Sequence, residues 1–236
     1  MSRRSAPAVL PPSLRAWLAL IGGLAAPAVL VLGVLYAGDS EPGTVDAWIW
    51  AAVHGVRPPW RNAALATDFL GEPAGAAALV VVAVVGCLLL RRPRAAVLVV
   101  VGPGTAVVTT TLLKSLVGRT IHGGHLSYPS GHTAFVTALA LAVALLAAGR
   151  LGLGRTVGTS LVFASALVAG AAMGWAQVAL GAHYPTDALG GWCTALAVVP
   201  VTAWLVDGVA DRLDDWLADR TDTDDRTANV GRNMRR

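Results

Sequence analysis

A histidine and an aspartate four residues apart, His183 and Asp187, form the pair with the clearest chemical use. The spacing places both side chains on one helical face, and Pro185 suits a first helical turn. An aspartate there fixes the tautomer of an imidazole and stabilises its cation, as a nucleophilic or general-base histidine requires. The alternative is an aspartate favoured by the helix dipole, next to a histidine without a role.

The run at residues 128–132, Tyr-Pro-Ser-Gly-His, opens an apolar stretch. At a helix N-terminus, the Ser130 hydroxyl and the N–H groups of Gly131 and His132 would cradle an anion, with His132 as an acid at its rim. Proline and glycine are also common beside a helix start for structural reasons alone.

Lys114 and Arg119 follow the end of another apolar stretch, and Lys114 is the only lysine among 18 lysine and arginine residues. A cation there either anchors the helix end at the membrane surface or neutralises an anion.

The rest of the chain is too apolar for a soluble domain. Its 236 residues are 55% hydrophobic and 14% charged, with a mean hydropathy of +0.62, which indicates an integral membrane protein. The net charge of +4 does not indicate a nucleic-acid partner, because the arginines cluster beside apolar segments. Cys87 and Cys193 lie inside apolar runs, so neither a disulfide framework nor a cysteine metal site is supported. No cofactor is predicted.

Six uncharged windows have about the 20 residues that a helix needs to cross a bilayer core. Backbone groups in lipid must be satisfied within their own segment, so each window is expected to be helical. The sequence therefore predicts an all-α, six-helix membrane bundle over residues 16–206, with spans at 16–37, 73–90, 95–113, 132–149, 156–180 and 185–206.

The arginines predict the orientation of these spans. They gather before the first span (Arg3, Arg4 and Arg15), at residues 91–94 and 150–155, and from Arg212 onward. Basic loops face the cytoplasm, so both termini are expected inside the cell membrane. Residues 38–72, 114–131 and 181–184 then face the exterior. The three polar groups, at residues 114–119, 128–132 and 183–187, all fall on this exterior face. Their shared position favours a single site over three unrelated sets of polar residues.

Three segments lie outside this regular pattern. Residues 1–15 are predicted as a cytoplasmic segment, and the first apolar run is longer than the core of a cleaved signal peptide, which favours a retained anchor. The tryptophan-rich residues 46–69 form either short helices at the membrane interface or an ordered loop. The charged residues 207–236 are expected to be a largely disordered cytoplasmic tail.

Taken in order, Lys114, the Pro-Ser-Gly-His run at 129–132 and the pair His183-x3-Asp187 resemble the signature of the type-2 phosphatidic acid phosphatase superfamily, the lipid phosphate phosphatases. The similarity covers about residues 70–206, with the signature within 114–187. It implies a six-helix fold of the lipid phosphate phosphatase type and a metal-independent hydrolase.

The resemblance also implies a role for each matching residue. His183 would attack phosphorus to form a phosphohistidine, Asp187 would hold His183, and His132 would protonate the leaving oxygen and then activate water. Lys114, Ser130 and the N–H groups of Gly131 and His132 would bind the phosphoryl oxygens. These cations and the helix N-terminus would take the place of a metal.

Two positions depart from the family pattern. Its first motif is K-x6-R-P, but Ile121 stands seven residues after Lys114, and an arginine, Arg119, stands five after it. Its third motif is S-R-x5-H-x3-D, but Ala176 and Gln177 stand at the first two places. We expect Arg119 to bind phosphate through a shifted loop, and Gln177 to donate a neutral hydrogen bond, about half as strong as a charged one.

The glycine-rich loop between these motifs holds His122 and His125, which match no metal motif. They either compensate for the missing arginines or belong to a flexible loop.

The predicted function is hydrolysis of a polyprenyl or phosphatidyl phosphate or diphosphate at the outer leaflet. The expected partners are the lipid phosphate substrate and membrane lipids, and protein partners are left open. One alternative is a lipid phosphotransferase, in which an acceptor hydroxyl replaces water. Another is a catalytically silent lipid-binding member, suggested by the missing arginines. The presence of His183, His132 and Asp187 argues against that alternative, because a binding protein needs no nucleophile.

Overall fold

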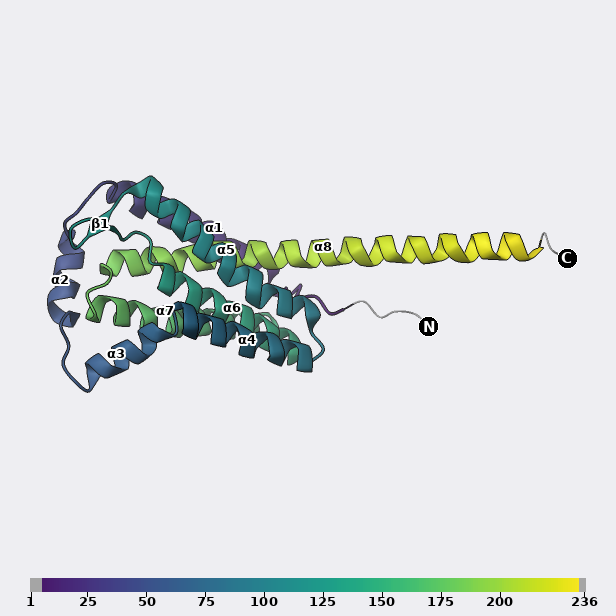
Figure 1. Ribbon diagram of the computed structural model, residues 1–236, viewed down its shortest axis with the longest axis horizontal. Coiled ribbons are helices and arrows are strands. Elements are labelled where there is room, and N and C mark those ends of the chain that lie inside the picture. The colour runs from purple at the N-terminus through teal and green to yellow at the C-terminus, as the bar shows by residue number, and fades with distance from the viewer. Residues whose placement is uncertain (1–5, 234–236) are drawn as a thin grey trace.

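The computed structural model describes residues 6–233, and side chains over residues 6–220. Arg3 and Arg4, which contribute to the predicted orientation, lie outside the described residues. The described part is almost entirely helical (Figure 1). Its helices are α1 (Arg15–Leu35), α2 (Thr44–Val53), α3 (Trp60–Phe69), α4 (Pro73–Leu89), α5 (Pro93–Val117), α6 (Gly131–Arg150), α7 (Arg155–Ala179) and α8 (Pro185–Asn233). Two short strands, β1 (Thr120–Ile121) and β2 (His125–Leu126), pair antiparallel.

The predicted all-α membrane bundle is confirmed. Within the described residues, five helices (α1, α5, α6, α7 and α8) are long and apolar enough to cross a membrane. α3 and α4 meet the same criteria only as a pair, bent by 63° at a short break, and they make a sixth span if the pair counts as one. This break is where Gly71 and Glu72 precede Pro73, whose ring starts α4 without a hydrogen-bond donor.

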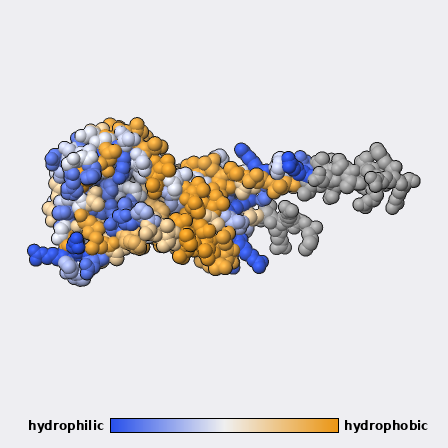
Figure 2. Space-filling model, viewed as in Figure 1, coloured by the Kyte–Doolittle hydropathy of each residue, from blue (hydrophilic) through white to orange (hydrophobic). Residues whose placement is uncertain are grey.

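Small residues let the central helix pack closely against its neighbours. Along α6, Ala134, Ala138, Ala142 and Ala148 are all buried. Close approach of helix backbones through small side chains is typical of membrane bundles. The outer faces instead expose leucine and valine, and Figure 2 shows this apolar surface around the bundle, with more polar residues at the end that carries α2. Lipid is the solvent that such a surface requires.

The two ends of the bundle differ in structure. Figure 1 shows α2 and the β1–β2 hairpin at one end and both chain termini beyond the other. At the terminal end, Asp207 accepts hydrogen bonds from the N–H groups of Val9 (2.8 Å) and Leu10 (2.9 Å). This buried carboxylate ties the segment before α1 to α8.

The segment after the last span differs from its prediction as a disordered tail. The structure continues α8 through residues 207–233, and residues 234–236 lie outside the described part. Arg94 at the start of α5 supports this helix, since its Nη1 bonds Asp211 (2.6 Å) and its Nη2 bonds Asp214 (3.0 Å). Asp207, Asp211 and Asp214 share one helical face at this spacing. Sequence composition does not reveal a partner 117 residues away.

Residues 46–69 follow the helical alternative, because both α2 and α3 are regular helices. α3 packs against α7, and α2 contacts α7 and α8. The residues between and around these helices therefore cover the end of the bundle where the α7–α8 loop lies.

Gly170 lets the backbone of α7 pack directly against the Trp192 side chain of α8. A Cβ at Gly170 would lie 2.2 Å from the Trp192 ring, whose Nε1 donates to the carbonyl of Ala166 (2.9 Å). We expect Gly170→Ala to destabilise the protein by about 1–3 kcal/mol through overpacking. Gly86→Ala is the matched control, because a Cβ there meets nothing within 4 Å. Thermal unfolding in detergent measures both, and equal midpoints would contradict this packing.

Candidate active site

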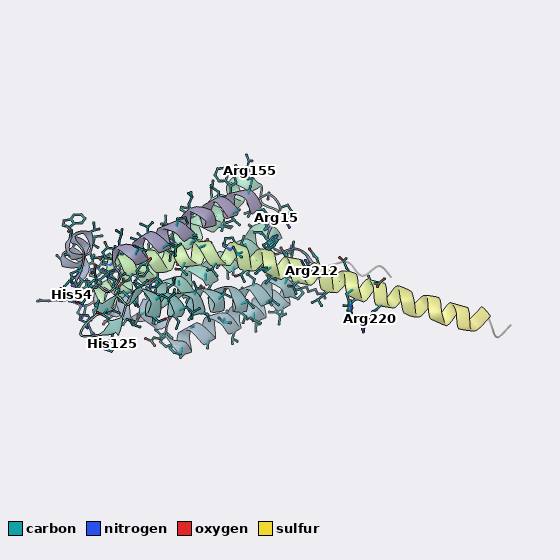
Figure 3. All side chains as sticks on the ribbon, turned by 90° about the horizontal axis from the view of Figure 1, so that it is seen from above. Arg15, His54, His125, Arg155, Arg212 and Arg220 are labelled. Atoms are coloured by element: carbon teal, nitrogen blue, oxygen red, sulfur yellow. The ribbon has the colours of Figure 1, made fainter. Side chains whose placement is uncertain are left out.

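Three segments that are distant in sequence meet at the end of the bundle that carries α2. They are the end of α5 with Lys114, the start of α6 with His132, and the α7–α8 loop with His183. In Figure 3, His54 and His125 lie at this end, and Arg212 and Arg220 lie along α8 beyond the opposite end. The sequence prediction that the polar groups share one end therefore agrees with their position in the fold.

Ser130 begins α6 and fixes its N-terminus. Its Oγ accepts hydrogen bonds from the N–H (3.3 Å) and Oγ1 (3.1 Å) of Thr133, as an N-cap serine does. The Ser130 N–H donates to the carbonyl of Asp187 (2.9 Å), and a Cβ on Gly191 would lie 2.3 Å from the Ser130 carbonyl oxygen. The anion cradle at α6 is thus held directly against the start of α8, with the Gly131 and His132 N–H groups in its first turn.

His183 and Asp187 face each other across 3.6 Å, from Nδ1 to Oδ2. Oδ2 of Asp187 also accepts the N–H of Tyr184 (3.0 Å). The gap to His183 is longer than a hydrogen bond, as is common in catalytic sites without substrate. The contact gives the aspartate the orienting position that the four-residue spacing predicts.

Burial sets the charge state of His183, which is only 6% exposed. Desolvation lowers the pKa of the His183 imidazole below its ordinary value. Asp187 opposes this effect, and the positive charges of Lys114 and His132 add to it. A neutral imidazole with a free electron pair is the form that a nucleophile requires.

Lys114 is half-buried and lies close enough to Asp187 and His183 to act on their charges. Within residues 6–220, its ammonium group has no hydrogen bond or ion pair to another side chain. Lys114 is therefore available to an anionic ligand.

Arg119, which is expected to bind phosphate, donates hydrogen bonds to groups of the protein. It is completely buried, and its Nη1 donates to Thr186 Oγ1 and to Asp187 Oδ1, both at 2.7 Å. Its Nη2 donates to Asp46 Oδ2, also at 2.7 Å. Two carboxylates of the protein thus occupy the nitrogens that a phosphate would need. These contacts favour a different interpretation, in which Arg119 acts on Asp187 from the side opposite His183.

Gln177 is also bound to a carboxylate of the protein. Its Nε2 donates to Oδ1 of Asp68 at the end of α3. The same Asp68 oxygen lies 3.9 Å from His132 Nε2. Oε1 of Glu72 lies 3.6 Å from the same His132 nitrogen. A Cβ on Gly71 would lie 2.3 Å from the His132 ring, so the α3–α4 break packs directly on this histidine. Gln177 thereby helps to hold the carboxylates that surround His132.

Asp68, Glu72 and His132 also have donor atoms of the kind that bind divalent cations, and these atoms lie within 4.8 Å of one another. In the part of the chain that the structure describes, no other group of three such residues converges in this way. His122 and His125 do not join this group, and His122 Nε2 forms a hydrogen bond with the Gly181 carbonyl (2.7 Å). Both carboxylates also lie within ion-pair distance of the His132 imidazole.

An apolar cavity of about 360 Å³ opens among α2, α7 and α8. Its walls include Ile49 and Val53 from α2, Gly174 and Val178 from α7, and Ala188 from α8. Ala188 follows Asp187 directly, so this cavity begins within one residue of the pair formed by His183 and Asp187.

Three acidic residues of this site were not identified from the sequence: Asp46, Asp68 and Glu72. Asp46 lies near the start of the short apolar helix α2, where an acidic residue is also favoured by the helix dipole. Asp68 lies in α3, a short helix of mixed composition, where a carboxylate is usually solvated. A usable signal existed for Glu72, since it directly precedes Pro73 at the start of a predicted span.

Comparisons with known proteins agree with this fold and these motifs. No curated protein matches the chain in sequence. Among solved structures, the chain is similar to one described as the crystal structure of the first transmembrane PAP2 type phosphatidylglycerolphosphate phosphatase from Bacillus subtilis. The TM-score is 0.63 at 22% identity, over 81% of this chain and 96% of that one, which shows a shared fold.

The family assignment comes from a separate comparison. A model of the PAP2 superfamily matches residues 74–210, more than half of the chain. This range includes Lys114, His132, His183 and Asp187. The chain belongs to the PAP2 superfamily.

Proposed function

We propose that this protein is a membrane phosphatase that removes the terminal phosphate from a lipid phosphate or diphosphate through a phosphohistidine. The observation that carries the proposal is the buried pair of His183 and Asp187 next to the N-terminus of α6. A nucleophile, its orienting carboxylate, an acid and an anion cradle thus come together at one end of the fold.

In the first half of the reaction, the Nε2 electron pair of His183 attacks phosphorus while Asp187 holds the Nδ1 proton. The bond from phosphorus to the lipid oxygen breaks, its electron pair stays on that oxygen, and His132 donates a proton to it. Lys114 and the N–H groups of Gly131 and His132 stabilise charge on the phosphoryl oxygens. The Ser130 hydroxyl lies at the same helix start and can donate a hydrogen bond to the phosphoryl oxygens.

In the second half, water replaces the lipid. His132 takes a proton from water as the oxygen attacks phosphorus, the N–P bond breaks, and its electron pair returns to Nε2 of His183. Orthophosphate and the neutral nucleophile are restored, and His132 is protonated for the next cycle. The roles of the two histidines are therefore unequal.

A lipid substrate is supported by the surroundings of the site. The site lies at the end of a membrane bundle, and the apolar cavity beside Ala188 offers a surface for a hydrocarbon chain. Polyprenyl and phosphatidyl phosphates both have such chains. The arginine distribution supports a site at the outer leaflet with both termini in the cytoplasm.

A silent lipid-binding member is the second candidate, because Arg119 and Gln177 both bind carboxylates of the protein. Lys114 then remains as the basic side chain available to phosphate. Phosphotransfer to an acceptor hydroxyl is separated from hydrolysis by analysis of the products.

We expect His183→Ala to abolish phosphate release from lipid phosphates, because no other group forms the intermediate. His132→Ala should slow the reaction by about 10²–10⁴-fold, most with poor leaving groups, since those need the proton most. Purified protein with a panel of lipid phosphates and diphosphates provides the measurement. EDTA should leave the rate unchanged; a loss that a divalent ion restores would instead assign Asp68, Glu72 and His132 to a metal.

Orthovanadate should inhibit competitively, because a trigonal-bipyramidal oxyanion resembles phosphorus under attack by His183. Lys114→Ala should weaken this inhibition and raise KM, since it removes an unpaired cation from the site. Inhibition constants of the two proteins measure the effect. A lipid phosphatase activity that millimolar vanadate does not change would contradict the proposed anion cradle.

The acid limb of the pH profile should reflect His183. Because the pKa of His183 is lowered from 6.5, the imidazole stays neutral and nucleophilic to a lower pH than a free histidine. Protonation removes the electron pair, so kcat/KM should fall with a midpoint below pH 6.5. The midpoint is measured from kcat/KM in detergent between roughly pH 4 and pH 8, the range over which imidazoles titrate. The stability of the protein is checked at each pH. A midpoint at or above 6.5 would contradict a buried neutral nucleophile.

A further inference from the structure

Asp46 is a fully buried carboxylate in a short helix whose other residues are more exposed. Its Oδ1 accepts the N–H of Thr186 (2.9 Å), and its Oδ2 accepts the Thr186 hydroxyl (2.8 Å) and Arg119 Nη2 (2.7 Å). A buried carboxylate without partners would be costly, so these bonds are what allow Asp46 to lie there. They also join α2 to the residue that precedes Asp187.

Arg119 connects Asp46 to the catalytic pair. Its guanidinium carbon lies 4.1 Å from the centre of the Tyr36 ring and 4.6 Å from that of Tyr184. Between these rings, its two terminal nitrogens are divided among Asp46, Thr186 and Asp187. A phosphate would have to displace a carboxylate of like charge to reach them. Both terminal nitrogens are therefore committed to groups of the protein, while Nε has no hydrogen-bond partner among the described residues.

The two oxygens of Asp187 have different partners. Oδ1 bonds Arg119 at 2.7 Å, and Oδ2 faces Nδ1 of His183 at 3.6 Å and accepts the Tyr184 N–H. Arg119 thus fixes the rotation of the carboxylate from one side, which aims the other side at the imidazole. An arginine with planar geometry performs this task better than a flexible ammonium group.

The charges of this cluster also bear on the reaction. One guanidinium lies between two carboxylates, so Asp46, Arg119 and Asp187 together carry a net negative charge, which the Lys114 ammonium near Asp187 partly offsets. The His183 imidazole gains positive charge when its Nε2 bonds to phosphorus, and a nearby negative charge stabilises that state. Without Asp46, Arg119 would neutralise Asp187 alone, and this stabilisation would decrease.

We propose that Asp46 and Arg119 are positioning residues for phosphoryl transfer, which hold Asp187 toward His183 and keep the buried cluster negative. The inference rests on the proposed function, because it requires His183 as the nucleophile. Through Asp46, which lies 137 positions before His183 in the chain, the proposal gives α2 a role in the reaction.

Asp46→Asn tests the proposal with the smallest change of shape. The amide keeps an oxygen for the Thr186 N–H but removes the charge. We expect kcat to fall by about 10–100-fold, the effect of losing one buried charged hydrogen bond. KM should stay unchanged, because Asp46 does not contact the anion cradle. The acid limb of kcat/KM should move to lower pH, since loss of a negative charge disfavours the imidazolium. Glu41→Gln, an exposed acid in the same segment, is the matched control and should behave as wild type.

Arg119→Lys tests the geometric half of the proposal. The charge is retained, but one ammonium group cannot hold both carboxylates in the same orientation. We expect a lower kcat with little shift of the acid limb. The double variant Asp46→Asn/Arg119→Lys should lose less than the product of the two single effects, because both act on Asp187.

Wild-type kcat and an unshifted acid limb in folded Asp46→Asn would overturn the inference and leave the proposed function intact. If Asp46→Asn does not fold by size-exclusion and thermal unfolding measurements, Thr186→Val replaces it. Valine removes the hydroxyl that bonds both Asp46 and Arg119, so a lower kcat at unchanged KM is expected. Wild-type kcat in both Thr186→Val and Arg119→Lys would also overturn the inference. A wild-type protein without activity, or an active His183→Ala, would instead contradict the proposed function.

Discussion

The guanidinium of Arg119, buried between Asp46 and Asp187, is the interaction on which the rest of the site depends. Three segments with no sequence proximity meet there: α2, the residues that lead into the β1–β2 hairpin, and the start of α8. Removing one member of a buried ion pair leaves the other uncompensated, which is strongly destabilising. The three segments therefore hold one arrangement, and the orientation of the catalytic carboxylate is part of it.

This arrangement changes how the negative charge of a phosphate is balanced. The PAP2 motifs would place arginines near Ile121 and Gln177, but here Arg119 and Gln177 both bind carboxylates of the protein. Lys114 and the N–H groups at the start of α6 remain for the phosphoryl oxygens. Weaker binding of the ground state raises KM without lowering kcat, provided that the remaining donors act in the transition state. A reduced cradle is therefore compatible with catalysis.

The membrane fold could be predicted from the sequence because bilayer thickness sets the length of each span. The predicted windows lie close to α1 and to α4 through α8, and the polar motifs occur where those helices begin or end. The pair of His183 and Asp187 could likewise be found, because a four-residue spacing is local. Ser130 as the N-cap of α6 follows from the same kind of local pattern.

The partners of Arg119 and Gln177 could not be predicted, because they depend on long-range contacts. Asp46 lies 73 residues from Arg119, and Asp68 lies 109 residues from Gln177, with no periodicity that links them. The direction of Arg119 depends on the preceding Gly118, whose φ of +68° turns the chain out of α5 and toward the interior. The sequence predicts a shifted loop at Arg119, but not the carboxylates that its guanidinium contacts.

Burial and charge have opposite effects on the nucleophile, and both are needed. Desolvation alone would favour a neutral His183 but would also oppose the positive charge that develops on its ring during attack. Asp187 relieves that opposition because its carboxylate faces the ring, and the bond from Arg119 to Asp187 moderates the negative charge that would otherwise favour a protonated ring before attack. A neutral resting imidazole that can still become cationic is the combination that phosphoryl transfer to histidine requires. Under the proposed role of Asp46, that combination would depend on a residue of the short helix α2, which covers the end of the bundle, and not on a residue of any membrane-spanning helix.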